Sequence, residues 1–81
     1  MKVHVQFYSQ LRDLAGAQSV EVDLAEKAIV ADLLEEVYEK APALRSRDKS
    51  ILVGAGMEFV DRNYEIKPDD EIALMPPVQG G

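Results

Sequence analysis

The chain opens with a strict alternation of apolar and polar residues. The apolar members of the alternation are Val3, Val5 and Phe7. Because successive side chains of a strand point to opposite faces, this pattern predicts a half-buried strand over residues 2–8. A second alternation at residues 20–24 predicts an antiparallel partner strand. We expect a loop or short helical turn between them, over residues 9–18, with Gly16 as its turn residue.

The period changes from two to about 3.6 in the middle of the chain. Apolar residues recur there at helical spacing and form one stripe: Val30, Leu33, Leu34, Val37 and Ala41. The stripe predicts an amphipathic helix from Val30 to Lys40. Pro42 is expected to end it, because the residue before a proline avoids helical backbone angles. No Ser, Thr, Asp or Asn directly precedes Val30, so the usual side-chain cap is expected to be missing.

Residues 43–50 are polar and basic, with Arg45, Arg47 and Lys49 alternating along them. We interpret this segment as a solvated loop, and the alternative is a docking patch for an acidic partner. The rest of the chain predicts strands over 51–53, 57–60 and 71–75, and tight turns at 54–56 and 67–70.

The resulting order is strand, strand, helix, strand, short strand, strand. One helix packed across one mixed sheet would bury all the apolar faces. We therefore expect an α+β fold of the ubiquitin-like β-grasp type, with its first and last long strands parallel at the centre of the sheet. The predicted body spans residues 1–75, and residues 76–81 form an extended tail.

Composition narrows the classes of function. With 81 residues and 47% hydrophobic content, the chain predicts one small globular domain. Its net charge of −6 argues against nucleic acid as a partner. No apolar run approaches the roughly 20 residues that span a bilayer, and the N-terminus has no signal-peptide pattern, so we expect a cytoplasmic protein.

Catalytic and metal-binding patterns are missing from the sequence. His4 is the only histidine and there is no cysteine, so no metal site is predicted. We interpret His4 as an exposed or cross-strand residue. No serine lies in a nucleophile-elbow context, and no glycine-rich phosphate loop occurs. The acidic run 69–71 is interpreted as the start of a strand. We therefore expect a domain that is not an enzyme on its own and holds no cofactor.

The last two residues, Gly80 and Gly81, are the remaining candidate for chemistry. Without Cβ atoms, they would let a thin chain end enter a narrow active site and present its carboxylate. A free carboxylate is a poor acyl donor, and activation by ATP as an acyl-adenylate would overcome this. Pro76 and Pro77 favour an extended, polyproline-II spacer. Six residues of about 3.3 Å each give the tail a reach of roughly 20 Å.

The ending Pro76-Pro77-Val78-Gln79-Gly80-Gly81 resembles the tail of the molybdopterin synthase small-subunit (MoaD) family. The resemblance extends over essentially the whole chain. Further matches are the opening strand at 2–7, Ser9 to Asp13, Gly16, Val30 to Leu34 and Glu58 to Val60. The Pro-Pro-Val-x-Gly-Gly ending is the specific part, since the other matches are common among β-grasp proteins.

The resemblance implies a mechanism. An ATP-dependent, E1-like enzyme would adenylate Gly81, and a sulfur donor protein would convert it to a thiocarboxylate (1-thioglycine). Pro76, Pro77, Val78, Gln79 and Gly80 would carry it into the large synthase subunit. There it would donate sulfur to precursor Z (cyclic pyranopterin monophosphate) for molybdenum cofactor biosynthesis. The two subunits form a heterotetramer in that family.

The resemblance also implies partner-interface residues. Tyr8 and Met75 align with apolar interface positions of the family, and Arg12 aligns with its loop arginine. Strand parity puts Tyr8 and Met75 on the face opposite the core, although ordinary exposed apolar residues would look the same.

Two other functions stay open at this point. One is a sulfur carrier for another pathway, such as thiazole formation. The other is a ubiquitin-like modifier that forms isopeptide bonds through Gly81. The remaining alternative is a β-grasp interaction domain whose tail takes part in no reaction. The sequence departs from the family at Ile29, where a capping Thr is common, and at two turns: Gly56-Met57 stands for the family's Asn-Gly, and Asp69-Asp70 for its Gly-Asp.

Overall fold

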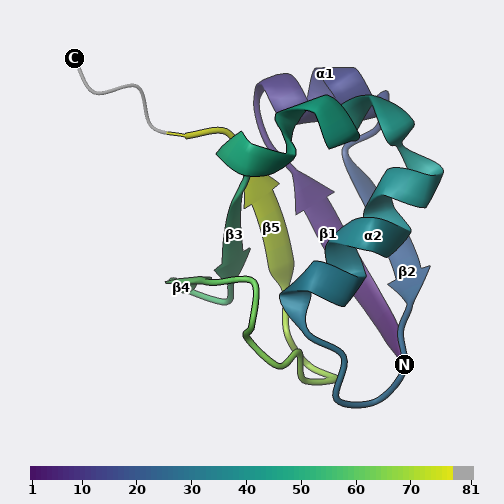
Figure 1. Cartoon of the computed structure of the whole chain (residues 1–81), viewed down its shortest axis with the longest axis vertical. Coiled ribbons are helices and arrows are strands. Elements are labelled where there is room, and N and C mark those ends of the chain that lie inside the picture. The colour runs from purple at the N-terminus through teal and green to yellow at the C-terminus, as the bar shows by residue number, and fades with distance from the viewer. Residues whose placement is uncertain (78–81) are drawn as a thin grey trace.

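The computed structural model describes residues 1–77, which form one five-stranded mixed sheet with a helix across one face (Figure 1). The strands are β1 (Lys2–Phe7), β2 (Ser19–Asp23), β3 (Leu52–Ala55), β4 (Glu58–Val60) and β5 (Ile72–Met75). The helices are α1 (Gln10–Ala15), α2 (Val30–Lys40) and the 3-10 helix η1 (Pro42–Ser50). Among the described residues, no helix has both the length and the apolarity needed to cross a bilayer.

The sheet has the order β2-β1-β5-β3-β4. β1 and β5 are parallel neighbours, while the β1–β2, β3–β5 and β3–β4 pairs are antiparallel. A parallel pair needs a long crossover connection, and the path from β2 through α2 and β3 supplies it. The predicted β-grasp fold, with its first and last long strands side by side, is confirmed.

The core lies between α2 and one face of the sheet. The predicted stripe of α2 is buried, as are the alternating residues of β1 and the pair Ile72 and Leu74 of β5. Burying one such aliphatic side chain stabilises the fold by about 1.5–3 kcal/mol. Tyr38, which lies outside the predicted stripe, is also buried. Within residues 1–77, no helix covers the opposite face of the sheet (Figure 1).

The first amide groups of α2 donate hydrogen bonds to backbone carbonyls that lie far away in the sequence. As predicted, the residue before Val30 supplies no side-chain cap, because the N-cap residue is Ile29. Instead, the amides of Val30 and Ala31 donate to the carbonyls of Tyr64 and Arg62, both at 3.0 Å. The amide of Ile29 donates to the carboxylate of Asp32 at 3.0 Å, which is one half of a capping box. The orphan donors of the helix therefore find partners in the segment that precedes β5.

Residues 42–50 form the 3-10 helix η1, so the prediction of a solvated loop there is wrong. Pro42 ends α2 as predicted, but its fixed φ and missing amide hydrogen also suit the first position of a new helix. Leu44 is fully buried and holds η1 to the body. The arginines and Lys49 of this segment are exposed, as expected.

The predicted turn at 54–56 is also misplaced. β3 runs through Ala55, and the turn falls at Gly56 and Met57. Gly54 is paired with Phe59 inside the ladder. It is a packing residue, because a Cβ there would lie 3.3 Å from Cε of Met75. The turn at 67–70 is confirmed by the hydrogen bond from the amide of Asp70 to the carbonyl of Lys67, at 3.0 Å.

Candidate functional site: the tail root and the open sheet face

The root of the tail, Pro76 and Pro77, follows β5 without a break. β5 lies in the middle of the sheet and pairs on both edges, so it is a rigid base. Both prolines line a narrow, mostly apolar cleft together with Leu11, Arg47, Ser50 and Ile51. Pro76 is half-buried and Pro77 is exposed. The chain therefore leaves the body between α1 and η1, at one end of the molecule (Figure 1).

The remaining predicted tail residues, Val78, Gln79, Gly80 and Gly81, lie outside the described residues. The division into a body (1–75) and a tail (76–81) stays a prediction for the same reason. β5 does end at Met75, directly before the two prolines.

Tyr8 and Met75 lie together on the open sheet face. Phe7 is paired with Leu74 across the parallel strands, so Tyr8 and Met75 are the next neighbours, and the amide of Tyr8 donates to the carbonyl of Leu74 at 3.1 Å. Tyr8 is 46% exposed and Met75 is half-buried. Their strand parity is as predicted, and their role at an interface stays a prediction.

Arg12 lies in α1 and is exposed. It lines a shallow pocket together with Gln6, Tyr8 and Gln18. The structure thus brings the predicted loop arginine beside Tyr8, near the end of the sheet from which the tail leaves. This pocket and the tail-root cleft adjoin neighbouring residues of α1: Arg12 lines the pocket, and Leu11 lines the cleft.

Phe59 and Met57 enlarge the apolar part of this face, and sequence reasoning missed them. Phe59 is 66% exposed and Met57 fully exposed, and both line a hollow with Gly54 and Met75. We define the open-face patch as Tyr8, Met57, Phe59 and Met75. The polar residue Glu58 next to Phe59 is the one sequence feature that could have indicated the exposure of Phe59. A strand of three residues is too short, however, for alternation to show which of its side chains face the core.

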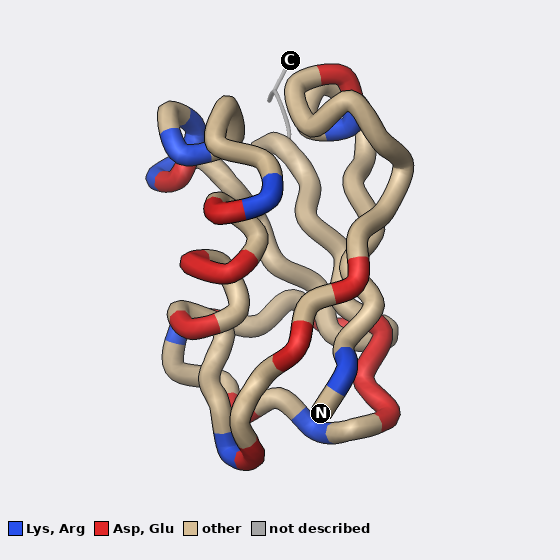
Figure 2. Tube along the Cα trace, turned by 90° about the vertical axis from the view of Figure 1, so that its right-hand side faces the viewer, with Lys and Arg blue, Asp and Glu red and all other residues tan. Residues whose placement is uncertain are grey.

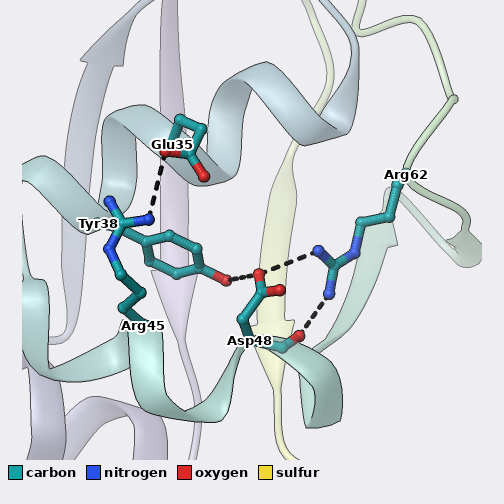
Figure 3. Close-up of polar contacts among 5 residues, drawn as sticks. All are labelled: Glu35, Tyr38, Arg45, Asp48 and Arg62. Carbon is teal, nitrogen blue, oxygen red and sulfur yellow. Dashed lines mark hydrogen bonds and ion pairs between the residues drawn. The ribbon is translucent and has the colours of Figure 1, made fainter.

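A polar cluster joins three segments: α2, η1 and the residues after β4 (Figure 3). The Tyr38 hydroxyl of α2 donates to Oδ1 of Asp48 in η1. The guanidinium of Arg62 donates to the same Oδ1 at 3.1 Å and to the backbone carbonyl of Asp48. The hydrogen bond from Tyr38 and the Arg62 charge hold the pKa of Asp48 below its usual value. Burial and the Asp48 contact raise the pKa of Tyr38, so its hydroxyl stays a donor.

Charge is divided unevenly over the surface. Arg45, Arg47 and Lys49 lie in η1, which lines the tail-root cleft, whereas the outward side of α2 is acidic (Figure 2). Asp32, Glu35 and Glu36 line a wide hollow with the segment 23–28. Within the described residues, no group of three or more acidic, histidine or cysteine side chains is arranged to hold a metal ion. His4 is exposed and pairs across strands with Glu21, as interpreted from the sequence.

Comparison with known families finds a match over nearly the whole chain. The sequence model of the ThiS family matches residues 5–81. A protein of Drosophila yakuba named molybdopterin synthase sulfur carrier subunit is 34% identical, over 100% of this chain and 92% of its own length. A Chlamydomonas reinhardtii protein of the same name is 30% identical, over 100% of both chains.

Solved structures show the same fold. The crystal structure of SAMP1, small archaeal modifier protein 1, from Haloferax volcanii superposes with a TM-score of 0.89 at 31% identity, over 100% of both chains. A putative molybdopterin converting factor subunit 1 from Pyrococcus furiosus has a TM-score of 0.85 at 28% identity, over 96% of this chain and 99% of its own.

Proposed function

Because the chain belongs to the ThiS family, we propose that it carries sulfur on its C-terminal glycine, Gly81, for the synthesis of molybdopterin. The observation that carries this proposal is the similarity, over the full chain, to two proteins named molybdopterin synthase sulfur carrier subunit. In this role the chain is a donor subunit, and a larger partner subunit supplies the catalytic residues.

The chemistry has two steps on the tail. A Gly81 carboxylate oxygen attacks the α-phosphorus of ATP, and pyrophosphate leaves, which gives an acyl-adenylate. Sulfur at the sulfide level, delivered by a sulfur donor protein, then attacks the acyl carbon, and AMP leaves. The product is a thiocarboxylate on Gly81. An E1-like enzyme catalyses the first step, and no group of this chain other than its tail takes part in bond making.

The thiocarboxylate then acts as the nucleophile toward precursor Z in the large subunit. Each attack displaces an oxygen substituent from a carbon of the precursor and gives a thioester between Gly81 and the precursor. Water then hydrolyses the acyl–sulfur bond, so the sulfur stays on the precursor and Gly81 is again a carboxylate that can be charged. Two such transfers supply both sulfur atoms of the dithiolene. Glycine suits this position because it puts no side chain beside the reacting carbon.

Two features of the described residues support the proposal. The tail root continues from β5, the middle strand of the sheet, so the body can dock as a rigid unit while the tail reaches into a partner. The open-face patch begins beside that root, at Tyr8 and Met75, and continues over β3 and β4 to Phe59 and Met57. It exposes aromatic and methionine side chains, which are enriched in protein interfaces. It is a suitable surface for the large subunit.

Reconstitution tests the proposal directly. The full chain is incubated with the activating enzyme, ATP and a sulfur source, and intact mass spectrometry should show a gain of about 16 Da, one oxygen replaced by sulfur. The charged protein is then mixed with a molybdopterin synthase large subunit and precursor Z, and molybdopterin should form. A variant without Gly81 should do neither. Failure to form molybdopterin with an active control carrier would refute the proposed pathway.

A modifier function is the second candidate, favoured by the similarity to SAMP1. In that case the Gly81 acyl group would pass to a lysine amine of another protein and form an isopeptide bond. Cell lysate would then contain a ladder of conjugates of higher mass that disappears when Gly81 is deleted. A carrier dedicated to sulfur transfer gives no ladder, and a carrier for another pathway binds a different synthase, such as a thiazole synthase, in a pull-down.

A further inference from the structure

The 3-10 helix η1 has little apolar anchorage. Leu44 is its only buried residue; Pro42 and Ala43 are exposed, and the six residues from Arg45 to Ser50 are polar or charged. A 3-10 helix also has poorer hydrogen-bond geometry than an α-helix, and runs of this length are uncommon. Contacts from other elements must therefore hold η1 in place.

The cluster of Tyr38, Asp48 and Arg62 supplies those contacts, and we call it the latch. It ties the C-terminal part of η1 to α2 on one side and to the segment after β4 on the other (Figure 3). Arg62 contacts both the carboxylate and the carbonyl of Asp48, so the backbone itself is held. Charge-assisted bonds of this kind are stronger than neutral ones.

A second tie near the start of η1 is more exposed. Arg45 lies over the ring of Tyr38, 5.1 Å from its centroid, and pairs with Glu35 at 3.4 Å. Exposed pairs of this kind contribute little to stability. The latch at Asp48 is thus the main polar anchor of η1.

The opposite side of η1 forms a wall of the tail-root cleft. Arg47, next to Asp48 in the chain, lines the cleft with Ser50 and Ile51. The amide of Ile51 donates to the carbonyl of Asp48 at 3.4 Å, the same carbonyl that Arg62 holds. A shift of Asp48 would therefore move the wall against which Pro76 and Pro77 lie.

We infer that the Tyr38–Asp48–Arg62 latch positions the root of the tail and so sets the direction in which the tail leaves the body. Four residues follow Pro77, which span up to about 13 Å when extended. A tilt of about 15° at the root would displace the far end by roughly 3 Å over that length. Misplacement of about 1 Å at a reacting group can already slow a reaction strongly. The functional consequence rests on the proposed function, whereas the structural part does not.

The test compares two tyrosines that make the same kind of bond. Tyr38→Phe removes the hydroxyl from the latch and keeps the buried ring. Tyr64→Phe is the matched control, since Tyr64 donates to Asp70 at 2.9 Å and lies outside the tail-root cleft. Asp48→Asn is a second latch variant, used if Tyr38→Phe does not fold. Nuclear Overhauser effects between Pro77 and Ile51 in the full chain report the tail root.

Both latch variants should lose at least about half of the Pro77–Ile51 intensity, while Tyr64→Phe keeps it. In ATP–pyrophosphate exchange with the activating enzyme, the latch variants should show a KM raised by about threefold or more at unchanged kcat, because fewer molecules present a correctly aimed tail. Loss of fold stability alone would raise KM threefold only if about two thirds of the molecules were unfolded, which circular dichroism would detect.

The inference is overturned if the latch variants keep the wild-type intensity, or if Tyr64→Phe loses as much as they do. If the wild-type chain is not adenylated at all, the proposed function fails, and the Pro77–Ile51 intensities still decide whether the latch holds the tail root. Intensities that fall while KM stays at the wild-type value would refute the functional part alone.

Discussion

At the scale of single residues, Asp48 shows how one carboxylate can hold three segments together. Its pKa is lowered in the folded protein, first by the hydrogen bond from Tyr38. A lowered pKa means that folding favours the charged form. The stabilisation is therefore complete above the unfolded-state value of about 3.9 and is lost as the pH falls through the lower native value.

Asp48→Asn should lower the free energy of unfolding by about 1 kcal/mol at neutral pH, a modest value because the pair with Arg62 is partly exposed. The difference from wild type should shrink as the pH falls below about 4. Urea titrations at neutral and acidic pH measure both quantities. Glu39→Gln, at an exposed position of α2, is the control and should change little. A difference that grows on acidification contradicts the assigned sign.

Substitution by alanine is expected to destabilise the protein at Gly16 and to leave its stability nearly unchanged at Gly54. Gly16 ends α1 with φ +72°, in open space, so Gly16→Ala should destabilise by about 1 kcal/mol through backbone strain alone. Gly54→Ala asks only the flexible end of Met75 to move, and alanine is favoured over glycine in a strand by roughly 0.5–1 kcal/mol. Chemical denaturation should find Gly54→Ala close to wild type. Equal losses at both positions would contradict this assignment.

At the scale of elements, α2 begins without a cap from the side chain of its N-cap residue, Ile29, yet most of its first amide donors have acceptors. The carbonyls of Tyr64 and Arg62 take two of them, and Asp32 accepts from Ile29. The segment 61–66 therefore does for α2 what a capping serine does in other helices.

Asp32→Ala should destabilise the protein by about 0.5–1 kcal/mol, the lower part of the range for lost caps, because the carbonyls of the segment 61–66 remain in place. Glu36→Ala, on the same exposed side of α2, should cost less, since no described hydrogen bond uses its carboxylate. Thermal unfolding of both variants makes the comparison, and a larger loss for Glu36→Ala would rule out the capping role of Asp32.

At the scale of the whole molecule, the two faces of the sheet have different tasks. One face packs against α2 and forms the core, while the other carries the open-face patch, of which Tyr8 and Met75 lie beside the tail root. A partner that receives the tail would cover the open-face patch at the same time. Contact at the patch would therefore fix the orientation in which the tail root faces the partner.

Phe59→Ser should weaken association with the large subunit by about tenfold or more, the cost typical of an aromatic interface anchor. Its fold should be unaffected, because Phe59 is 66% exposed. Titration calorimetry with the purified large subunit measures the affinity, and circular dichroism checks the fold. Glu39→Gln on α2 serves again as control. Unchanged affinity in Phe59→Ser would remove this residue from the proposed interface.

Much of the fold follows from local pattern. Alternation predicts β1, β2 and β5, and the helical stripe predicts α2 with its observed bounds. The strand parity of Tyr8 and Met75 likewise places both on the open face. These features can be predicted from the sequence because each depends on the periodic burial of residues that are close together in the chain.

Only the tertiary structure shows the contacts between residues far apart in the chain. The latch joins Tyr38, Asp48 and Arg62, and no periodicity links them. The short strands behave in the same way: Gly54 resembles a turn residue until Met75 is seen to lie over it. Local sequence thus determines which residues face the core and supplies the chemistry of the tail. How the root of that tail is seated depends on long-range packing, because its cleft is built from α1, η1 and the end of β5 together.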